Sequence, residues 1–114
     1  ERKAFGKSID KFQALQFRLA DMEIELQSGR TFLRQAAWKL DNGAPDATHF
    51  CAMAKKLVTD MGSRVANDCL QLHGGYGYLA DYGIEKTVRD LRVHQILEGT
   101  NEIMRVIIAR SLRA

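Results

Sequence analysis

The stretch FQALQFRLADMEIELQSGRTFLRQAAWKL, residues 12–40, decides the fold of this chain. Its apolar residues recur at helical spacings, at Phe12, Leu15, Leu19, Met22, Leu26, Leu33, Ala37 and Leu40. This period predicts one long amphipathic helix whose apolar stripe faces a helical partner. Asp10 and Gln13 resemble a capping box at the start of the helix, and Gly43 suits its end.

The next periodic stretch predicts a second long helix. Pro45 interrupts the chain, and Asp46 is a candidate cap for the helix that follows. Apolar residues then recur, mostly four apart, at Phe50, Ala54, Leu57, Met61, Val65, Cys69 and Leu72. Gly74 and Gly75 give the stop signal.

Two shorter helices complete the pattern. Ile84, Val88 and Leu91 are spaced by four and three residues, which predicts a helix over residues 84–92. Thr100 is the N-cap candidate for a last helix near the end of the chain.

Length and composition agree with one helical domain. The chain has 114 residues, a single proline and many strong helix formers. The four segments therefore predict an all-α, antiparallel four-helix bundle in residues 10–114. Residues 1–9 are expected to be the tail of a preceding helix and a loop that leads into the bundle. Because the chain opens on ERKAFGKS without an initiator methionine, we expect it to be part of a longer protein.

Charge and cysteine content argue against several classes of function. The net charge is +3 and its signs alternate, which is typical of a solvated surface and not of a nucleic-acid-binding one. No apolar run reaches the roughly 18 residues that a membrane span needs, and no signal peptide is visible. Cys51 and Cys69 lie in one expected helix, about 27 Å apart along its axis, so we expect two buried thiols in a reducing compartment.

One acidic residue has an unusual setting. In HQILEGTNEIMR, residues 94–105, Glu98 follows the apolar Ile96 and Leu97 and stands where one helix ends and the next begins. A carboxylate against apolar groups has a raised pKa, which suits a base that removes a weakly acidic proton. A helix-end acid without catalytic role explains the same position, and the residues alone leave both interpretations open.

Other candidate sites have less support. The glycines of QLHGGYGY, residues 71–78, allow a backbone to approach a phosphate, but a helix stop and a loop explain them too. A metal site is not expected, because the paired Glu-x-x-His motifs of di-iron bundles are absent and His94 with Glu98 forms only one candidate pair. No serine lies in a G-x-S-x-G setting.

Four motifs, in order, resemble the C-terminal helical domain of acyl-CoA dehydrogenases. ERKAFGKSI is similar to the family's Arg-x-x-Phe-Gly segment, and FQALQFRLADM to the helix after it. QLHGGYGY is similar to its Gln-x-x-Gly-Gly-x-Gly loop, and VRDLRVHQILEGTNEIMRVIIAR to its closing Glu-Gly-Thr segment. The resemblance spans the whole chain and, within the family, is greatest to isobutyryl-CoA and other short-branched-chain enzymes.

This resemblance implies a flavoenzyme that oxidises an acyl-CoA thioester to the trans-2-enoyl-CoA. Glu98 matches the catalytic glutamate, which removes the α-proton while the β-hydride passes to the flavin of FAD. Gly99 lets the chain pass close to the substrate, and Thr100 and Glu102 match positions near the adenine-diphosphate half of FAD. Glu102 is often Gln in the family. Some branches, such as the isovaleryl enzymes, have glycine in place of Glu98 and carry the base on an earlier helix.

A second set of residues matches positions that reach the FAD of a neighbouring subunit, at Arg2, Phe5, Gln13, Gln71, Gly74 and Gly75. The resemblance therefore implies a homo-oligomer, a dimer or a tetramer packed through this domain. It also implies acyl-CoA as substrate, an electron-transfer flavoprotein as acceptor, and a location in the mitochondrial matrix or the bacterial cytoplasm. The family's enzymes are much longer than this chain and add an N-terminal helical domain and a middle β-domain.

Two other functions stay open. The chain could be a non-catalytic, self-associating helical bundle with an incomplete FAD site, and the purified protein would then be colourless and inert. An acyl-CoA oxidase shares the fold and the base but forms peroxide from oxygen. On its own the 114-residue chain is expected to be inactive, because the two further domains carry the main flavin-binding face.

Overall fold

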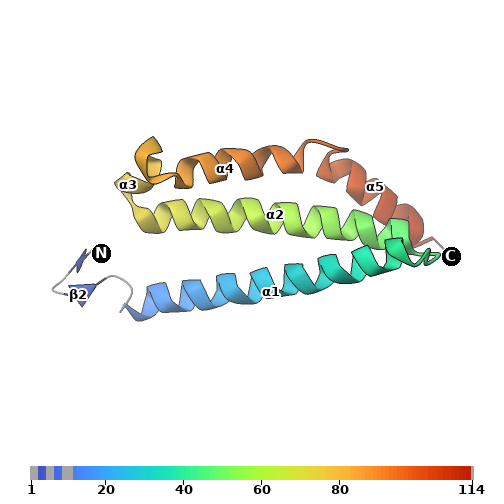
Figure 1. Cartoon of the computed structure of the whole chain (residues 1–114), viewed down its shortest axis with the longest axis horizontal. Helices are drawn as coiled ribbons and strands as arrows, with labels where there is room; N and C mark the ends of the chain where they lie inside the picture. The colour runs from blue at the N-terminus through green and yellow to red at the C-terminus, as the bar shows by residue number, and fades with distance from the viewer. Residues whose placement is uncertain (1–2, 5–6, 9–11, 114) are drawn as a thin grey trace.

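Helices make up almost all of the described chain. The computed structural model describes residues 3–4, 7–8 and 12–113 (Figure 1). In chain order the elements are β1 (Lys3–Ala4), β2 (Lys7–Ser8), α1 (Gln13–Asp41), α2 (Ala47–His73), α3 (Gly75–Tyr78), η2 (Ala80–Tyr82), α4 (Ile84–Arg92), η3 (Val93–Gln95) and α5 (Asn101–Ser111). The expected all-α class is confirmed. Within segment 1–9, where the sequence predicts the tail of a helix, the four described residues form the antiparallel pair β1 and β2.

Helix α2 is the central element of the molecule. Figure 1 shows α1 along one side of α2 and the α4–α5 segment along the other, so that the helices lie in three rows. α1 and α2 run antiparallel, and α4 returns antiparallel to α2. The result is a helical bundle of 58 × 26 × 24 Å in which α4 and α5 follow one another along α2.

Glycine and threonine end and begin helices where the sequence predicts it. Gly43 (φ +63°) and Gly74 (φ +64°) adopt positive φ just beyond α1 and α2, a conformation that glycine reaches without a Cβ clash. The Thr100 hydroxyl accepts a 3.3 Å hydrogen bond from the Ile103 amide and caps α5. Helix α4 covers the predicted residues 84–92.

The starts of α1 and α2 differ from the expected caps. Asp10 lies outside the described residues, and α1 begins at Gln13 with Phe12 at the N-cap and no side-chain cap bond. Asp46 does occupy the N-cap of α2, but its carboxylate accepts two 3.0 Å hydrogen bonds from Lys39 Nζ instead of capping the helix. The hydrogen bond from Lys39 lowers the pKa of Asp46. An ion pair across the α1–α2 turn therefore takes the place of the cap.

Small side chains allow α1 to lie close against α2. Every seventh residue of the α1 seam is buried, namely Met22, Gly29 and Ala36. A Cβ added at Gly29 would lie 2.8 Å from Met61 Cε, so the missing side chain makes room for Met61 of α2. Phe32 and Phe50 stack between the same two helices with ring centroids 5.6 Å apart.

The predicted apolar stripe of α1 is only partly buried. Four of its leucines, Leu19, Leu26, Leu33 and Leu40, are 47%, 37%, 49% and 64% exposed. We call these four residues the leucine rim. Its prediction as a face buried within this chain is wrong, because α4 and α5 pack on the other side of α2 and no other described element covers the rim. A seam between two helices buries only about two positions in seven, and the broader apolar face extends beyond it.

Two expectations from composition can be compared with the structure. Cys51 and Cys69 are free, as expected, but they are half-buried and not fully enclosed. No helix in the described part of the chain is both long enough and apolar enough to cross a membrane.

We predict that Gly29→Leu lowers the free energy of unfolding by about 1–3 kcal/mol, because the new side chain must displace Met61 from a closely packed seam. Removing a glycine from a helix recovers about 1 kcal/mol of propensity, which offsets only part of this loss. Ser28→Leu adds the same side chain at the exposed neighbouring position and should change stability by less than about 0.5 kcal/mol. Urea unfolding followed by circular dichroism measures both variants, and equal midpoints would contradict the close seam.

Candidate functional site

The turn between η3 and α5 contains the residues that the sequence analysis singles out first. Glu98 has φ +57° and Gly99 has φ +85°, so two consecutive residues adopt positive φ before Thr100 starts α5. A Cβ at Gly99 would lie 2.9 Å from Met104 Cε, and φ there is also unfavourable for other residues. The Glu-Gly-Thr segment is therefore a tight turn that ends one helical stretch and begins the next.

Glu98 is the single non-glycine residue with positive φ among those the structure describes. A left-handed conformation costs an L-residue about 1–2 kcal/mol, so the surrounding structure must enforce it. Such residues cluster at active sites and ligand-binding turns. Helices often end in a left-handed residue, but that residue is usually glycine or asparagine, and the carboxylate of Glu98 makes this turn a candidate functional site.

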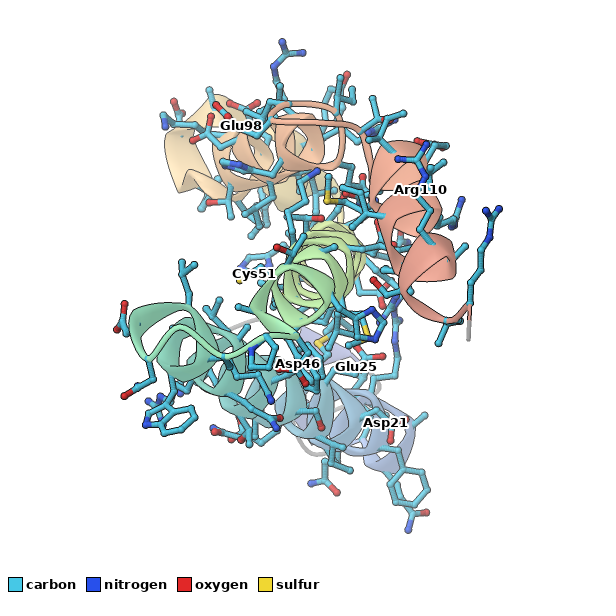
Figure 2. The ribbon with its side chains drawn as sticks, turned by 90° about the vertical axis from the view of Figure 1, so that its right-hand side faces the viewer. Asp21, Glu25, Asp46, Cys51, Glu98 and Arg110 are labelled. Carbon is cyan, nitrogen blue, oxygen red and sulfur yellow. The ribbon has the colours of Figure 1, made fainter. Side chains whose placement is uncertain are left out.

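The Glu98 side chain is exposed on the α4–α5 side of the molecule. Viewed along the bundle, it lies at the outer edge of that row, with Cys51 of α2 in the middle and Asp21 of α1 on the far side (Figure 2). Ile96, one of its apolar neighbours in sequence, is 52% exposed. The described residues therefore present the carboxylate outward and do not enclose it in apolar groups.

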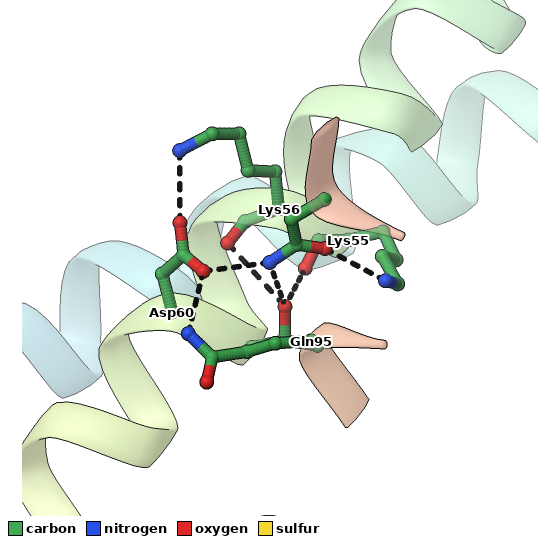
Figure 3. A network of polar contacts seen from close by, with 6 residues as sticks. Lys55, Lys56, Asp60 and Gln95 are labelled. Atoms are coloured by element: carbon green, nitrogen blue, oxygen red, sulfur yellow. Dashed lines mark hydrogen bonds and ion pairs between the residues drawn. The ribbon is translucent and has the colours of Figure 1, made fainter. Parts of the chain in front are cut away.

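A polar network beneath the turn joins it to α2 (Figure 3). Lys55 Nζ donates to the Gly99 carbonyl oxygen at 2.8 Å and to Asn101 Oδ1 at 2.7 Å. Asn101 Nδ2 donates to Thr59 Oγ1 at 2.9 Å and to Asp60 Oδ1 at 2.6 Å. Asn101 is 5% exposed and is the buried polar residue of the described chain. Both donors of the amide and one acceptor lone pair of its oxygen are therefore paired with groups on α2, as expected for a buried amide.

Asp60 is the acidic centre of this network. Its carboxylate also accepts hydrogen bonds from Lys56 Nζ at 2.8 Å and from Gln95 Nε2 at 2.9 Å. Partial burial favours the neutral acid, but the hydrogen bonds from Lys56, Gln95 and Asn101 outweigh it and lower the pKa of Asp60 to about 2. Asp60 is therefore ionised at neutral pH and connects α2, η3 and α5.

A groove of about 750 Å³ lies between α2, α4, η3 and α5, next to the turn. Thr100 and Glu102 line it, together with three arginines, Arg64, Arg92 and Arg105. The arginines come from three different helices, and no local motif in the sequence points to their meeting. Arg64 is already paired with Glu25 of α1 at 2.8 Å, and the charges of Arg92 and Arg105 suit an anionic group such as a phosphate.

The remaining candidate residues lie at the other end of the bundle. Gln13 begins α1, and Gln71, Gly74 and Gly75 end α2 and begin α3. The 3.5 Å ion pair of Arg18 with Asp68 shows that these two helix ends are adjacent. Gln13, Gln71 and Gly75 are exposed, and nothing lies within 4 Å of a Cβ added at Gly75. Arg2 and Phe5 lie outside the described residues.

Two separate groups of candidates therefore exist in one chain. Lys55, under the Glu98 turn, and Gln71 are 16 residues apart on α2, which corresponds to about 24 Å along the helix. The structure brings Glu98, Gly99, Thr100 and Glu102 together at one place, and Gln13, Gln71, Gly74 and Gly75 at another. Within the described residues, no three His, Cys, Asp or Glu side chains gather as a metal site would require.

The comparisons with known proteins agree with one another. The family model for the acyl-CoA dehydrogenase C-terminal domain matches residues 1–113. The mitochondrial isobutyryl-CoA dehydrogenase of Bos taurus is 51% identical over 111 residues, which are 97% of this chain and 27% of the bovine protein. A crystal structure of an acyl-CoA dehydrogenase from Geobacillus kaustophilus is similar with a TM-score of 0.95 and 45% identity, over 100% of this chain and 30% of that one. An FAD complex of PigA is similar with a TM-score of 0.90 and 35% identity, over 97% of this chain and 29% of that one. The chain thus spans less than a third of the length of these relatives.

The Asp60 network predicts a loss of stability in acid. The pKa of Asp60 is about 2 in the folded state and near 3.8 in the unfolded chain, so its contribution is present above about pH 4 and is lost as the pH falls toward 2. The side chain is 29% exposed, and the contribution is at most about 2 kcal/mol. Asp60→Asn should reduce stability at pH 6 and flatten its pH dependence between pH 4 and 2.

Asp90→Asn is the matched control for this prediction, because Asp90 pairs with Lys86 on the exposed face of α4. Its stability curve should run parallel to that of the unchanged protein. Urea unfolding at a series of pH values measures all three proteins. An Asp60→Asn curve with the same acid slope as the unchanged protein would contradict the role given to Asp60.

Proposed function

The chain belongs to the acyl-CoA dehydrogenase family as a C-terminal domain, and we propose that it supplies the catalytic base to a longer flavoenzyme that oxidises an acyl-CoA thioester to the 2-enoyl-CoA. The observation that carries this proposal is the Glu98 turn. An acid with a strained backbone stands exposed at a helix junction, and a buried polar network beneath it connects the turn to α2. A base that must meet a substrate from outside this chain needs both exposure and a fixed position.

In the proposed reaction, Glu98 accepts the proton from the α-carbon of the thioester. The β-carbon loses its hydrogen with the bonding electrons, and the carbon–carbon double bond forms between the two positions. FAD, when bound, supplies the two-electron acceptor for that hydrogen. Gly99 carries no side chain, so the thioester can lie close to the turn, and the apolar groups that complete the pocket come from the rest of the longer protein.

The described residues suit an FAD that lies partly on this domain. Thr100 and Glu102 line the groove beside α5, where the charges of Arg92 and Arg105 suit a diphosphate. Gln71, Gly74 and Gly75 are placed at the far end of the bundle, about 24 Å from the turn. We propose that this second group, with Gln13, Arg2 and Phe5, reaches the FAD of a neighbouring subunit.

A homo-oligomer follows from that arrangement. The leucine rim of α1 leaves a row of apolar side chains exposed in the single chain, which supports a dimer or tetramer in which a further chain or domain covers it. We propose residues 10–114 as the bundle domain and residues 1–9 as the segment that connects it to preceding domains.

The substrate that we propose is a short, branched acyl-CoA. The bovine relative is named an isobutyryl-CoA dehydrogenase, and it is 51% identical to this chain. An electron-transfer flavoprotein is proposed as the acceptor of the electrons, and the mitochondrial matrix or the bacterial cytoplasm as the location. An acyl-CoA oxidase would keep the same base, and formation of peroxide in place of reduction of a dye distinguishes it.

We predict that Glu98→Gln in the longer protein lowers kcat by about 10²- to 10⁴-fold, because the amide has no basic oxygen to accept the α-proton. The flavin absorbance should stay, since the change is isosteric. Glu85→Gln, on the first turn of α4, removes a comparable acid away from the turn and should keep full activity. Dye reduction with an acyl-CoA measures the activity of both variants, and an active Glu98→Gln enzyme would contradict the assignment of Glu98 as the base.

The isolated 114-residue chain should be colourless and should not reduce a dye with acyl-CoA. Only part of the proposed flavin site lies in this chain, so cofactor affinity depends on the missing contacts. Absorbance near the flavin bands after incubation with FAD and desalting gives the result. A yellow, active isolated domain would show that this domain binds flavin and catalyses by itself. It would contradict the proposal that the rest of the longer protein completes the flavin site.

A further inference from the structure

Lys55 is the residue of α2 that touches the Glu98 turn directly. Its amino group, part of a half-buried side chain, lies 2.8 Å from the carbonyl oxygen of Gly99. That carbonyl belongs to the residue immediately after Glu98. The two positive φ angles, at Glu98 and Gly99, therefore determine both the direction of the carbonyl and the direction of the Glu98 side chain. A charged donor on this oxygen is stronger than a neutral hydrogen bond and favours the one backbone conformation that presents the oxygen to it.

Asn101 extends the contact from one atom to a rigid support. Its Oδ1 accepts from Lys55 at 2.7 Å, and its Nδ2 donates to Asp60 at 2.6 Å. Rotating the amide by 180° would place its NH₂ against the ammonium group and its oxygen against the carboxylate, so the two charges fix its orientation. Lys55, Asn101 and Asp60 therefore form a charge-ordered chain of hydrogen bonds that ends on the turn.

The neighbouring Lys56 is a natural comparison for Lys55, because the two lysines differ in their contact with the turn. Lys56 Nζ binds Asp60 Oδ2 at 2.8 Å and makes no hydrogen bond to the turn within the described part of the chain. Lys55 and Lys56 have the same charge and adjacent positions on α2, and both are half-buried. They differ in that only Lys55 bonds to the backbone of the Glu98–Gly99 segment.

We propose that Lys55 and Asn101 are positioning residues for the base, which keep the Glu98–Gly99 turn in its left-handed conformation and so direct the Glu98 carboxylate at the α-carbon of the substrate. This inference rests on the proposed function of Glu98. Without the Lys55 contact, Glu98 can relax to a negative φ, and its carboxylate then leaves the position that the reaction needs. The base remains present and ionisable, but the fraction of time it spends in position falls.

The test uses the longer flavin-bound protein and compares Lys55→Met with Lys56→Met. Methionine keeps the length and the apolar stem of lysine and removes the charge and the donor. Lys55→Met should lower kcat by about 10–100-fold, the order expected of a misplaced catalytic group, with KM for the thioester within about twofold. Lys56→Met should keep kcat within about twofold. Flavin content and thermal midpoint are measured for both, so that a loss of folded enzyme is separated from a loss of turnover.

Two further readouts separate positioning from general stability. Deuteration at the α-carbon of the substrate should slow Lys55→Met more than the unchanged enzyme, because proton removal becomes more rate-limiting. Acetyl-CoA has α-hydrogens but no β-hydrogen, so only the base acts on it. Its α-hydrogens should exchange with D₂O more slowly in Lys55→Met than in Lys56→Met, as measured by mass spectrometry.

If Lys55→Met does not fold, Lys55→Gln takes its place, because the amide keeps a donor without the charge, and kcat should fall by a smaller factor. The inference would be overturned if the Lys55 variant that folds had the same kcat, isotope effect and exchange rate as the unchanged enzyme. Equal losses in the Lys55 and Lys56 variants would also overturn it. A Glu98→Gln enzyme that stays active is a different result, since it removes the proposed base itself and with it the reason for positioning it.

Discussion

The hydrogen bonds of the Asn101 side chain fix the second half of the molecule against the first. They join residues more than 40 positions apart in sequence and bring α5 onto α2 at one buried point. A hydrogen bond from Gln95 to the same Asp60 brings η3 there as well. A buried amide needs such partners, because a donor or acceptor left without any hydrogen bond costs about 1–3 kcal/mol. The position of the Glu98 turn follows from this requirement, since the turn immediately precedes Asn101 and shares Lys55 with it.

Local chemistry predicted the helices well and their contacts poorly. Gly43, Gly74 and Thr100 act within one turn of their own position, so the sequence showed where helices begin and end. Asp46 is predicted as a cap for the same local reason, yet its carboxylate accepts hydrogen bonds from Lys39 and makes no cap bond to the helix amides. The leucine rim is predicted to be buried, because the periodicity of the sequence identifies an apolar face but does not show how many helices cover that face.

The residues of the candidate site also differ in whether local sequence can predict them. Glu98 and Gly99 could be found from a short motif, because the acid, the glycine and the cap adjoin in sequence. Lys55, Asp60 and Asn101 could not, because the two charged residues lie on α2 and Asn101 lies on α5, and no spacing in the sequence predicts a contact between them. Their meeting is a consequence of packing α4 and α5 along α2. The positive φ of Glu98 is likewise a property of the folded turn, and Glu is not a residue from which it would be anticipated.

The left-handed backbone at position 98 also constrains how such a sequence can change over generations. Glycine is the residue that this backbone favours, so a Glu98→Gly exchange relieves about 1 kcal/mol of strain while it removes the carboxylate. With Glu98 in its proposed role as the base, selection for stability and selection for proton abstraction oppose each other at a single codon. A lineage that acquires a base on another helix is released from the conflict, and glycine is then the stabilising replacement. A lineage that keeps its base in the turn retains the strained acid as the cost of turnover.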